Sequence, residues 1–166
     1  MYQCGDQVIY GSHGVCLISD LEERVIDKKR VQYFVLQPLG SAGSRFYVPA
    51  HNPAALAKLR PILSKEAMLQ LLRSESIRQD CWNPDETMRK MTYRELISSC
   101  DREALLRMVN TLHRHRRECL EQGRKFHLCD ENFLRDAQRI LSAELSVVLE
   151  IPASEVPAYV QHILDA

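Results

Sequence analysis

The sequence has no long apolar run and no sign of a secretory leader. None of its hydrophobic stretches approaches the roughly 20 residues that a membrane-spanning helix requires. Its first residues, Met1 to Asp6, contain neither the basic segment nor the apolar segment that directs secretion. We therefore expect a cytoplasmic protein that does not contact a membrane.

The chain also lacks an excess of either charge. It contains 22 Lys and Arg against 22 Asp and Glu, so its formal net charge is 0. Non-specific affinity for DNA comes mainly from basic side chains that replace condensed counterions. The composition excludes a strong, autonomous nucleic-acid binder, and any DNA contact must be local or assisted by another protein. With 45% hydrophobic residues over 166 positions, the chain can still fold into one domain or two small ones.

Paired cysteines are absent. The six cysteines are scattered through apolar patterns without any C-x-x-C pair, so we expect reduced, mostly buried small hydrophobes. The nearest candidate metal group, Cys119, His127 and Cys129, lacks a fourth ligand at a suitable spacing. The sequence therefore predicts no metal and no other cofactor.

Catalytic motifs are equally scarce. No G-x-x-x-x-G-K-[ST] phosphate-binding loop is present, which excludes a helicase motor. His13 lies in a Gly-Ser-His-Gly turn without an accompanying nucleophile, base and oxyanion donor, and we interpret it as a turn-stabilising side chain. The sequence indicates a protein that is not an enzyme.

What the chain does contain is one change of pattern near residue 63, from period-2 alternation to helical spacing. Five short antiparallel strands in about sixty residues cannot leave a flat sheet with two open edges. We therefore predict a small, bent SH3- or Tudor-like β-barrel over residues 1–63, with an edge strand available for pairing with another protein. The expected strands are 7–10, 14–25, 31–38, 45–48 and a fifth near 59–63, with turns at 11–14, 27–29 and 40–43.

Residues 64–166 carry helix caps and apolar residues at helical spacing, which predicts an all-α bundle. The strongest start signal is Asn83-Pro84-Asp85-Glu86, where Asn83 is a suitable N-cap and Pro84 suits the first helical position. The expected helices are 64–73, 83–99, 101–122, 130–149 and a short one after 154, with a polar connection over 74–81. The whole chain is thus predicted to be an α+β protein of two domains, 1–63 and 64–166.

Several segments together resemble a known family. Residues 5–15, which read G-D-Q-V-I-Y-G-S-H-G-V, are similar to the opening G-D-x-V-V-Y-x-x-H-G-V of the CarD and CdnL bacterial transcription regulators. The same module occurs in transcription-repair coupling factors. The resemblance continues at Tyr33-Phe34-Val35-Leu36, Phe46-Tyr47-Val48-Pro49, Trp82, Ala137-Gln138-Arg139-Ile140-Leu141 and Glu144-Leu145.

This resemblance implies a regulator with two partners. Its β domain would bind the first lobe of the RNA polymerase β subunit by edge-strand pairing. Its helical domain would meet promoter DNA at the upstream fork of the transcription bubble, where a tryptophan wedges into the minor groove. The bound protein would then alter the lifetime of the open complex. We expect weak, largely sequence-independent DNA contacts and a monomeric protein.

On the β domain, the resemblance assigns three residues to polymerase binding. Arg24 and Ile26 correspond by spacing to polymerase-facing positions of the family, and Tyr47 falls where some members have an arginine. An alternative remains open for Ile26 and Tyr47, because both could simply be strand residues on one face of the barrel.

On the helical domain, Trp82 is the main candidate for DNA contact, because a flat side chain before a helix start can insert at a distorted base step. The alternative is a hydrophobic staple in which Trp82 packs on Met88. Arg89 and Lys90 follow on the helix that the family uses to touch phosphate. Their first turn is acidic here, which departs from the arginine-rich stretch of other members.

The densest basic cluster surrounds Gly123, and we assign Arg124 and Lys125 from it to DNA binding. These two residues could equally belong to an ordinary solvated helix end. The next helix begins with Asp130 and Glu131, where the family tends to place basic residues. Because of these departures, a second hypothesis is an adaptor that binds polymerase and another protein without touching DNA.

Overall fold

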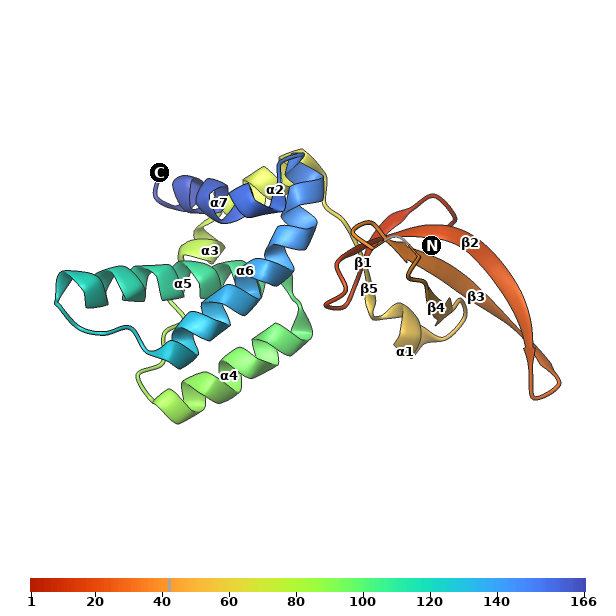
Figure 1. The fold of residues 1–166 in the computed structure, drawn as a ribbon, viewed down its shortest axis with the longest axis horizontal. Helices are drawn as coiled ribbons and strands as arrows, with labels where there is room; N and C mark the ends of the chain where they lie inside the picture. Colours follow the sequence, from red (N-terminus) through yellow and green to blue (C-terminus); the bar gives the residue numbers. More distant parts are fainter. Residues whose placement is uncertain (42) are drawn as a thin grey trace. The chain divides into compact units, whose positions relative to one another are not determined.

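The structure is a computed structural model that describes residues 1–41 and 43–166. The chain divides into two compact units, Met1–Ile62 and Leu63–Ala166, which are described separately. The first is built on a β-sheet and the second is helical (Figure 1). The predicted α+β fold class is therefore confirmed.

The first unit contains a five-stranded antiparallel sheet in the order β4-β3-β2-β1-β5. A short helix, which the sequence did not predict, separates the last two strands. The predicted turn at 40–43 includes Ala42, which lies outside the described residues. The elements are β1 (Gln7–Tyr10), β2 (Val15–Ile26), β3 (Lys29–Pro38), β4 (Phe46–Pro49), α1 (Pro53–Leu56) and β5 (Leu59–Pro61).

The two longest strands, β2 and β3, form a hairpin that extends beyond their neighbours (Figure 1). Its turn consists of Asp27 and Lys28, whose φ angles of 50° and 63° suit a two-residue hairpin turn that follows the strand twist. One face of the sheet buries the core of the unit. This core consists of Val8, Cys16, Ile18, Phe34, Leu36, Val48, Ala50 and Leu59.

The register of β2 against β3 shifts by one residue between Ile18 and Asp20. Ile18 pairs with Leu36 on the core face, whereas Asp20 pairs with Val35 on the opposite face. The extra residue is Ser19, whose hydroxyl donates to the Val35 carbonyl at 3.3 Å. Such a bulge reverses which residues of a strand face the core.

The second unit is a bundle in which α6 contacts α2, α4, α5 and α7. Its interior is mostly apolar, with fully buried leucines on α5 and α6, but it also contains the buried side chains of Arg89, Asp130 and Glu144. No helix in the described part of the chain is both long and apolar enough to cross a membrane. The elements are α2 (Lys65–Leu72), α3 (Glu75–Arg78), α4 (Glu86–Ser99), α5 (Arg102–Glu121), α6 (Leu128–Leu149), η1 (Ala153–Glu155) and α7 (Val156–Leu164).

Two helix starts and one connection differ from the prediction. The expected N-cap Asn83 was wrong, because α4 is capped by Asp85, whose carboxylate accepts from the Met88 N–H at 3.1 Å. Asn83 instead accepts from the Asp85 N–H and closes a turn around Pro84. The expected polar connection at 74–81 contains α3, and α6 begins at Leu128 rather than at Asp130.

Candidate functional sites

Arg24, Ile26 and Tyr47 lie on one face of the β-sheet. Strand register places Tyr47 opposite Val35, and the bulge in β2 turns Arg24 and Ile26 to this same face, away from the core. Ile26 is 46% exposed and Tyr47 is 38% exposed. The structure therefore places on one face the three residues that the resemblance assigned to polymerase binding. Arg24 and Tyr47 meet there, whereas Ile26 lies farther along the hairpin, next to its turn.

Arg24 and Tyr47 also contact each other directly. The guanidinium carbon of Arg24 lies 4.0 Å from the centroid of the Tyr47 ring, a cation–π contact. Glu22 also pairs with this guanidinium, with 3.3 Å between Arg24 Nη2 and Glu22 Oε2. The contact fixes a positive charge over an exposed aromatic ring, which suits an acidic or polar partner surface.

The hairpin end next to these residues has open strand margins. The pairing of β2 with the N-terminal segment ends at Ile18, whose N–H donates to the Asp6 carbonyl at 2.9 Å. On the other side, the contact of β3 with the chain that follows β4 ends where the Ala50 N–H donates to the Gln32 carbonyl. Beyond these points, within the described residues, β2 and β3 pair only with each other. Their outer edges can therefore accept a further strand.

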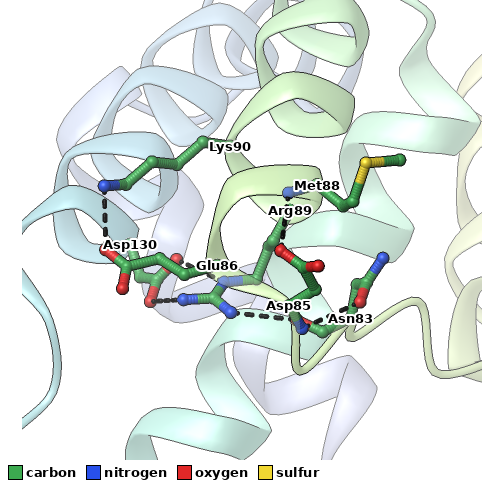
Figure 2. A network of polar contacts seen from close by, with 7 residues as sticks. All are labelled: Asn83, Asp85, Glu86, Met88, Arg89, Lys90 and Asp130. Atoms are coloured by element: carbon green, nitrogen blue, oxygen red, sulfur yellow. Dashed lines mark hydrogen bonds and ion pairs between the residues drawn. The ribbon is translucent and has the colours of Figure 1, made fainter.

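The second candidate site surrounds Trp82, which lies between α3 and α4 and is partly buried. Its ring stacks on the imidazole of His115 from α5, with a centroid distance of 3.5 Å and an interplanar angle of 17°. The guanidinium carbon of Arg89 lies 4.1 Å from the indole centroid. The expected alternative partner, Met88, is 49% exposed and points away from the Arg89 network (Figure 2). The indole is thus held by His115 and Arg89, and it is neither sealed in the core nor free in solvent.

Arg89 itself is fixed by a buried ion pair (Figure 2). Its Nε and Nη2 donate to the two carboxylate oxygens of Asp130, each at 3.0 Å, and its Nη1 donates to the Asn83 carbonyl at 2.9 Å. The side chains are 3% exposed for Arg89 and 0% exposed for Asp130. Burial lowers the pKa of Arg89, but hydrogen bonding to Asp130 and the charge of Asp130 raise it more, so the guanidinium stays charged.

This placement changes what Arg89 can do. The sequence assigned it to phosphate contact, yet its guanidinium is buried and its donors serve Asp130 and Asn83. Contact with phosphate requires loss of the ion pair, which would leave the Asp130 carboxylate buried and uncompensated. Arg89 is therefore suited to holding the indole of Trp82 and the turn before α4.

The remaining basic candidates differ in availability. The Lys90 ammonium lies 2.8 Å from the Glu86 carboxylate, and hydrogen bonding to Lys90 lowers the pKa of Glu86, so the acidic first turn partly neutralises this lysine. Arg124 and Lys125 are exposed on the loop between α5 and α6. Within residues 1–41 and 43–166, neither of these two forms an ion pair, which leaves both charges available to a partner.

His115 connects the loop to the indole. Its ring also lies 6.3 Å from the ring of Phe126, which directly follows Lys125. Burial is the main cause that lowers the pKa of His115, and the positive charges of Arg89 and Arg124 lower it further. His115 could not be predicted as a site residue, because nothing in the local pattern of α5 relates it to Trp82, which lies 33 positions earlier.

The cysteines form no metal centre in the described part of the chain, where no group of three His, Cys, Asp or Glu residues could hold an ion. Cys16, Cys100 and Cys119 are buried as expected, whereas Cys4 is exposed. Cys81 has a local role, because its N–H and thiol both donate to the Thr111 hydroxyl, at 3.1 and 3.3 Å. These bonds fix the backbone immediately before Trp82.

One comparison bears on the first unit. Residues 2–63 match the family described as the CarD-like/TRCF RID domain. The matched segment covers the entire sheet and the face that carries Arg24, Ile26 and Tyr47.

Proposed function

Because residues 2–63 are a CarD-like/TRCF RID domain, the RNA polymerase-interacting domain shared by CarD and TRCF, we propose that this chain is a non-enzymatic transcription regulator that acts on polymerase at promoters. The domain match carries this proposal. The first unit, residues 1–62, binds the β subunit of RNA polymerase. The second, helical unit contacts promoter DNA at the upstream edge of the transcription bubble. The protein acts in the cytoplasm as a monomer.

The polymerase contact uses the outer face and the open margin of the β2–β3 hairpin. A strand of the partner adds to one of the free edges and supplies backbone hydrogen bonds. Arg24, Ile26 and Tyr47 then provide the side-chain contacts that select the partner. Support comes from their common face and from the cation–π contact that orders Arg24 before binding.

The DNA contact uses Trp82, with Arg124 and Lys125 as phosphate-binding residues and Lys90 as a weaker contributor. Arg89 supports the indole instead of touching phosphate. A neutral protein binds DNA weakly by itself, but tethering to polymerase raises the local concentration of the helical unit at the promoter. Neither contact then needs high intrinsic affinity.

The regulator acts by shifting the equilibrium between closed and open promoter complexes. If it binds the open complex about 1 to 2 kcal/mol more tightly than the closed complex, promoter output changes several-fold. The test is the lifetime of open complexes on several promoters, measured with and without the full chain. A changed lifetime on at least some promoters is expected, and an unchanged lifetime on all of them would falsify the proposal.

A second candidate function is a polymerase-bound adaptor that contacts another protein and never touches DNA. It is favoured by the partly neutralised Lys90 and the buried Arg89, which reduce the positive charge available on the helix that the resemblance assigned to phosphate contact. The variant Trp82→Ala separates the two functions. Under the first, polymerase binding survives while the effect on open-complex lifetime falls. Under the second, the open-complex lifetime and the promoter footprint do not depend on Trp82.

A further inference from the structure

The segment that leads to Trp82 is attached to α5 by a series of side-chain contacts. Each of these hydrogen bonds joins a side chain of α5 to a backbone group of residues 76–81. Arg107 donates to the Ser76 carbonyl at 2.8 Å, and Asn110 donates to the Ile77 carbonyl at 3.2 Å. Further along α5, the Thr111 hydroxyl accepts from the Cys81 N–H at 3.1 Å, and Arg114 donates to the Arg78 carbonyl.

His115 is the next residue along α5, and it contacts the indole itself. The α5 residues that form these hydrogen bonds, at positions 107, 110, 111 and 114, lie on one face of the helix, and position 115 continues this face. The centroid distance of 3.5 Å and the angle of 17° describe a close, nearly parallel stack of the two rings. Thus α5, and not only the following helix α4, determines where the indole lies.

We propose that His115 is a positioning residue that sets the plane of the Trp82 indole for its contact with promoter DNA. This inference rests on the proposed function. A side chain that already lies in its binding orientation loses little conformational freedom on binding. The stack on His115 supplies that order from one side chain, and the Arg89 guanidinium, itself anchored by Asp130, supplies it from another.

The stack on His115 would have the opposite effect if it blocked the indole. If the imidazole occupied the place of a base and had to leave before Trp82 could reach DNA, the stack would inhibit the protein. The two cases predict opposite changes in the promoter effect when the ring is removed. Removal of the His115 ring weakens the promoter effect if the ring positions the indole, and strengthens the effect if the ring blocks it.

The experiment compares His115→Ala and His115→Phe with the wild-type full chain. Trp82 is the only tryptophan, so the anisotropy decay of its fluorescence reports the mobility of this one indole. We expect His115→Ala to increase that mobility and to reduce the effect on open-complex lifetime by about 2- to 10-fold, the range that one ring–ring contact supplies. His115→Phe keeps an aromatic ring and should restore both measurements. Polymerase affinity should not change in either variant.

Trp82→Ala, measured in parallel, separates this inference from the proposed function. If Trp82→Ala loses the promoter effect but His115→Ala retains or strengthens it, the positioning role is overturned and the proposed function stands. Unchanged indole mobility in His115→Ala overturns the positioning role as well. If Trp82→Ala itself changes nothing, the DNA contact is wrong and the inference falls with it. Thermal unfolding of His115→Ala controls for loss of folding, and His115→Phe provides the test if the alanine variant is unfolded.

Discussion

Arg24 on β2 and Tyr47 on β4 contact each other across the intervening strand β3, with 4.0 Å between the guanidinium carbon and the ring centroid. Two strands that are not neighbours are thereby joined on the exposed face of the sheet. A substitution at either residue removes this contact.

Reversal of charge at Arg24 is expected to weaken polymerase binding. Arg24→Glu places a carboxylate where a partner would meet a guanidinium, and like charges across an interface disrupt association. We expect affinity for the β-subunit lobe to fall by at least about tenfold in a pull-down or titration with the full chain.

Arg30→Glu is the matched control for this change. Arg30 lies on the same hairpin, is exposed and pairs with Glu23, but strand register places it on the opposite face from Arg24. It should retain most of the wild-type affinity. Equal losses in the two variants would point to a non-specific charge effect and would contradict the assigned face.

Removal of the buried charge at Asp130 is expected to destabilise the helical unit strongly. Asp130→Ala leaves the Arg89 guanidinium buried without a counter-charge, a change that typically costs about 3 to 5 kcal/mol. Urea unfolding, monitored by the fluorescence of Trp82, measures the free energy of unfolding. Glu86→Gln, which breaks the exposed pair with Lys90, is the control and should cost far less, because solvent screens such pairs.

The double variant Arg89→Met, Asp130→Leu extends this test. No unpaired charge remains in the interior, so stability should recover well above that of Asp130→Ala. The cation–π contact with Trp82 is nevertheless lost, and the promoter effect should fall. Full promoter activity in a stable double variant would show that Arg89 does not support the indole.

Acid conditions are expected to weaken the helical unit. Burial is the main cause that lowers the pKa of both His113 and His115 below the ordinary value of 6.5. The unfolded chain therefore binds protons more readily, so stability present above about pH 6.5 is lost as the pH falls through that value toward the folded-state pKa. The charged groups that influence the two rings are Arg89, Glu118, Arg124 and Asp130 for His115, and Arg116, Arg117 and Asp165 for His113.

The measurement is the free energy of unfolding at several pH values between 7.5 and 5.5. The variant His113→Gln, His115→Gln carries no titrating group at either position and should show a shallower decline over this range. A wild-type free energy that rises on acidification would contradict the assignment.

The exposed loop between α5 and α6 is expected to carry the salt dependence of DNA contact. Each phosphate contact contributes about −0.9 to the slope of log affinity against log salt. Arg124→Ala with Lys125→Ala should reduce that slope by about 2 for the full chain bound to a polymerase–promoter complex. Arg135→Ala with Arg139→Ala, which removes two exposed charges of α6, is the control. An equal loss of slope in both pairs would assign the effect to net charge alone.

The architecture could be predicted from the sequence because its signals are local. Alternation located all five strands to within a few residues, and the helices expected at 64–73 and 101–122 match α2 and α5, whose N-caps are Ser64 and Asp101. The helices α1 and α3 were missed, because each has four residues and is too short to show a helical period. The start of α4 was misplaced because Asn83 and Asp85 are both suitable N-caps, and it is the Asp85 carboxylate that accepts from the Met88 N–H.

The candidate site could be predicted only in part, because it depends on contacts between residues that are far apart in the sequence. Trp82, Arg124 and Lys125 were identified from residue type and position. The burial of Arg89 depends on Asp130, which lies 41 positions later and appeared in the sequence only as a departure from the family pattern. The contact of His115 with Trp82 is likewise set by the packing of the segment 76–82 on α5.

The extra residue in β2 affects how the sequences of relatives should be aligned. An unbulged strand of the same length would present Arg24 and Ile26 to the core, so the residue count before Asp20 determines which side chains reach a partner. A homologue that lacks the bulge must be one residue shorter at this point to keep the same outward residues. The gap in such an alignment therefore belongs at Ser19, because a gap placed in the hairpin turn would pair outward residues with inward ones between the bulge and the turn.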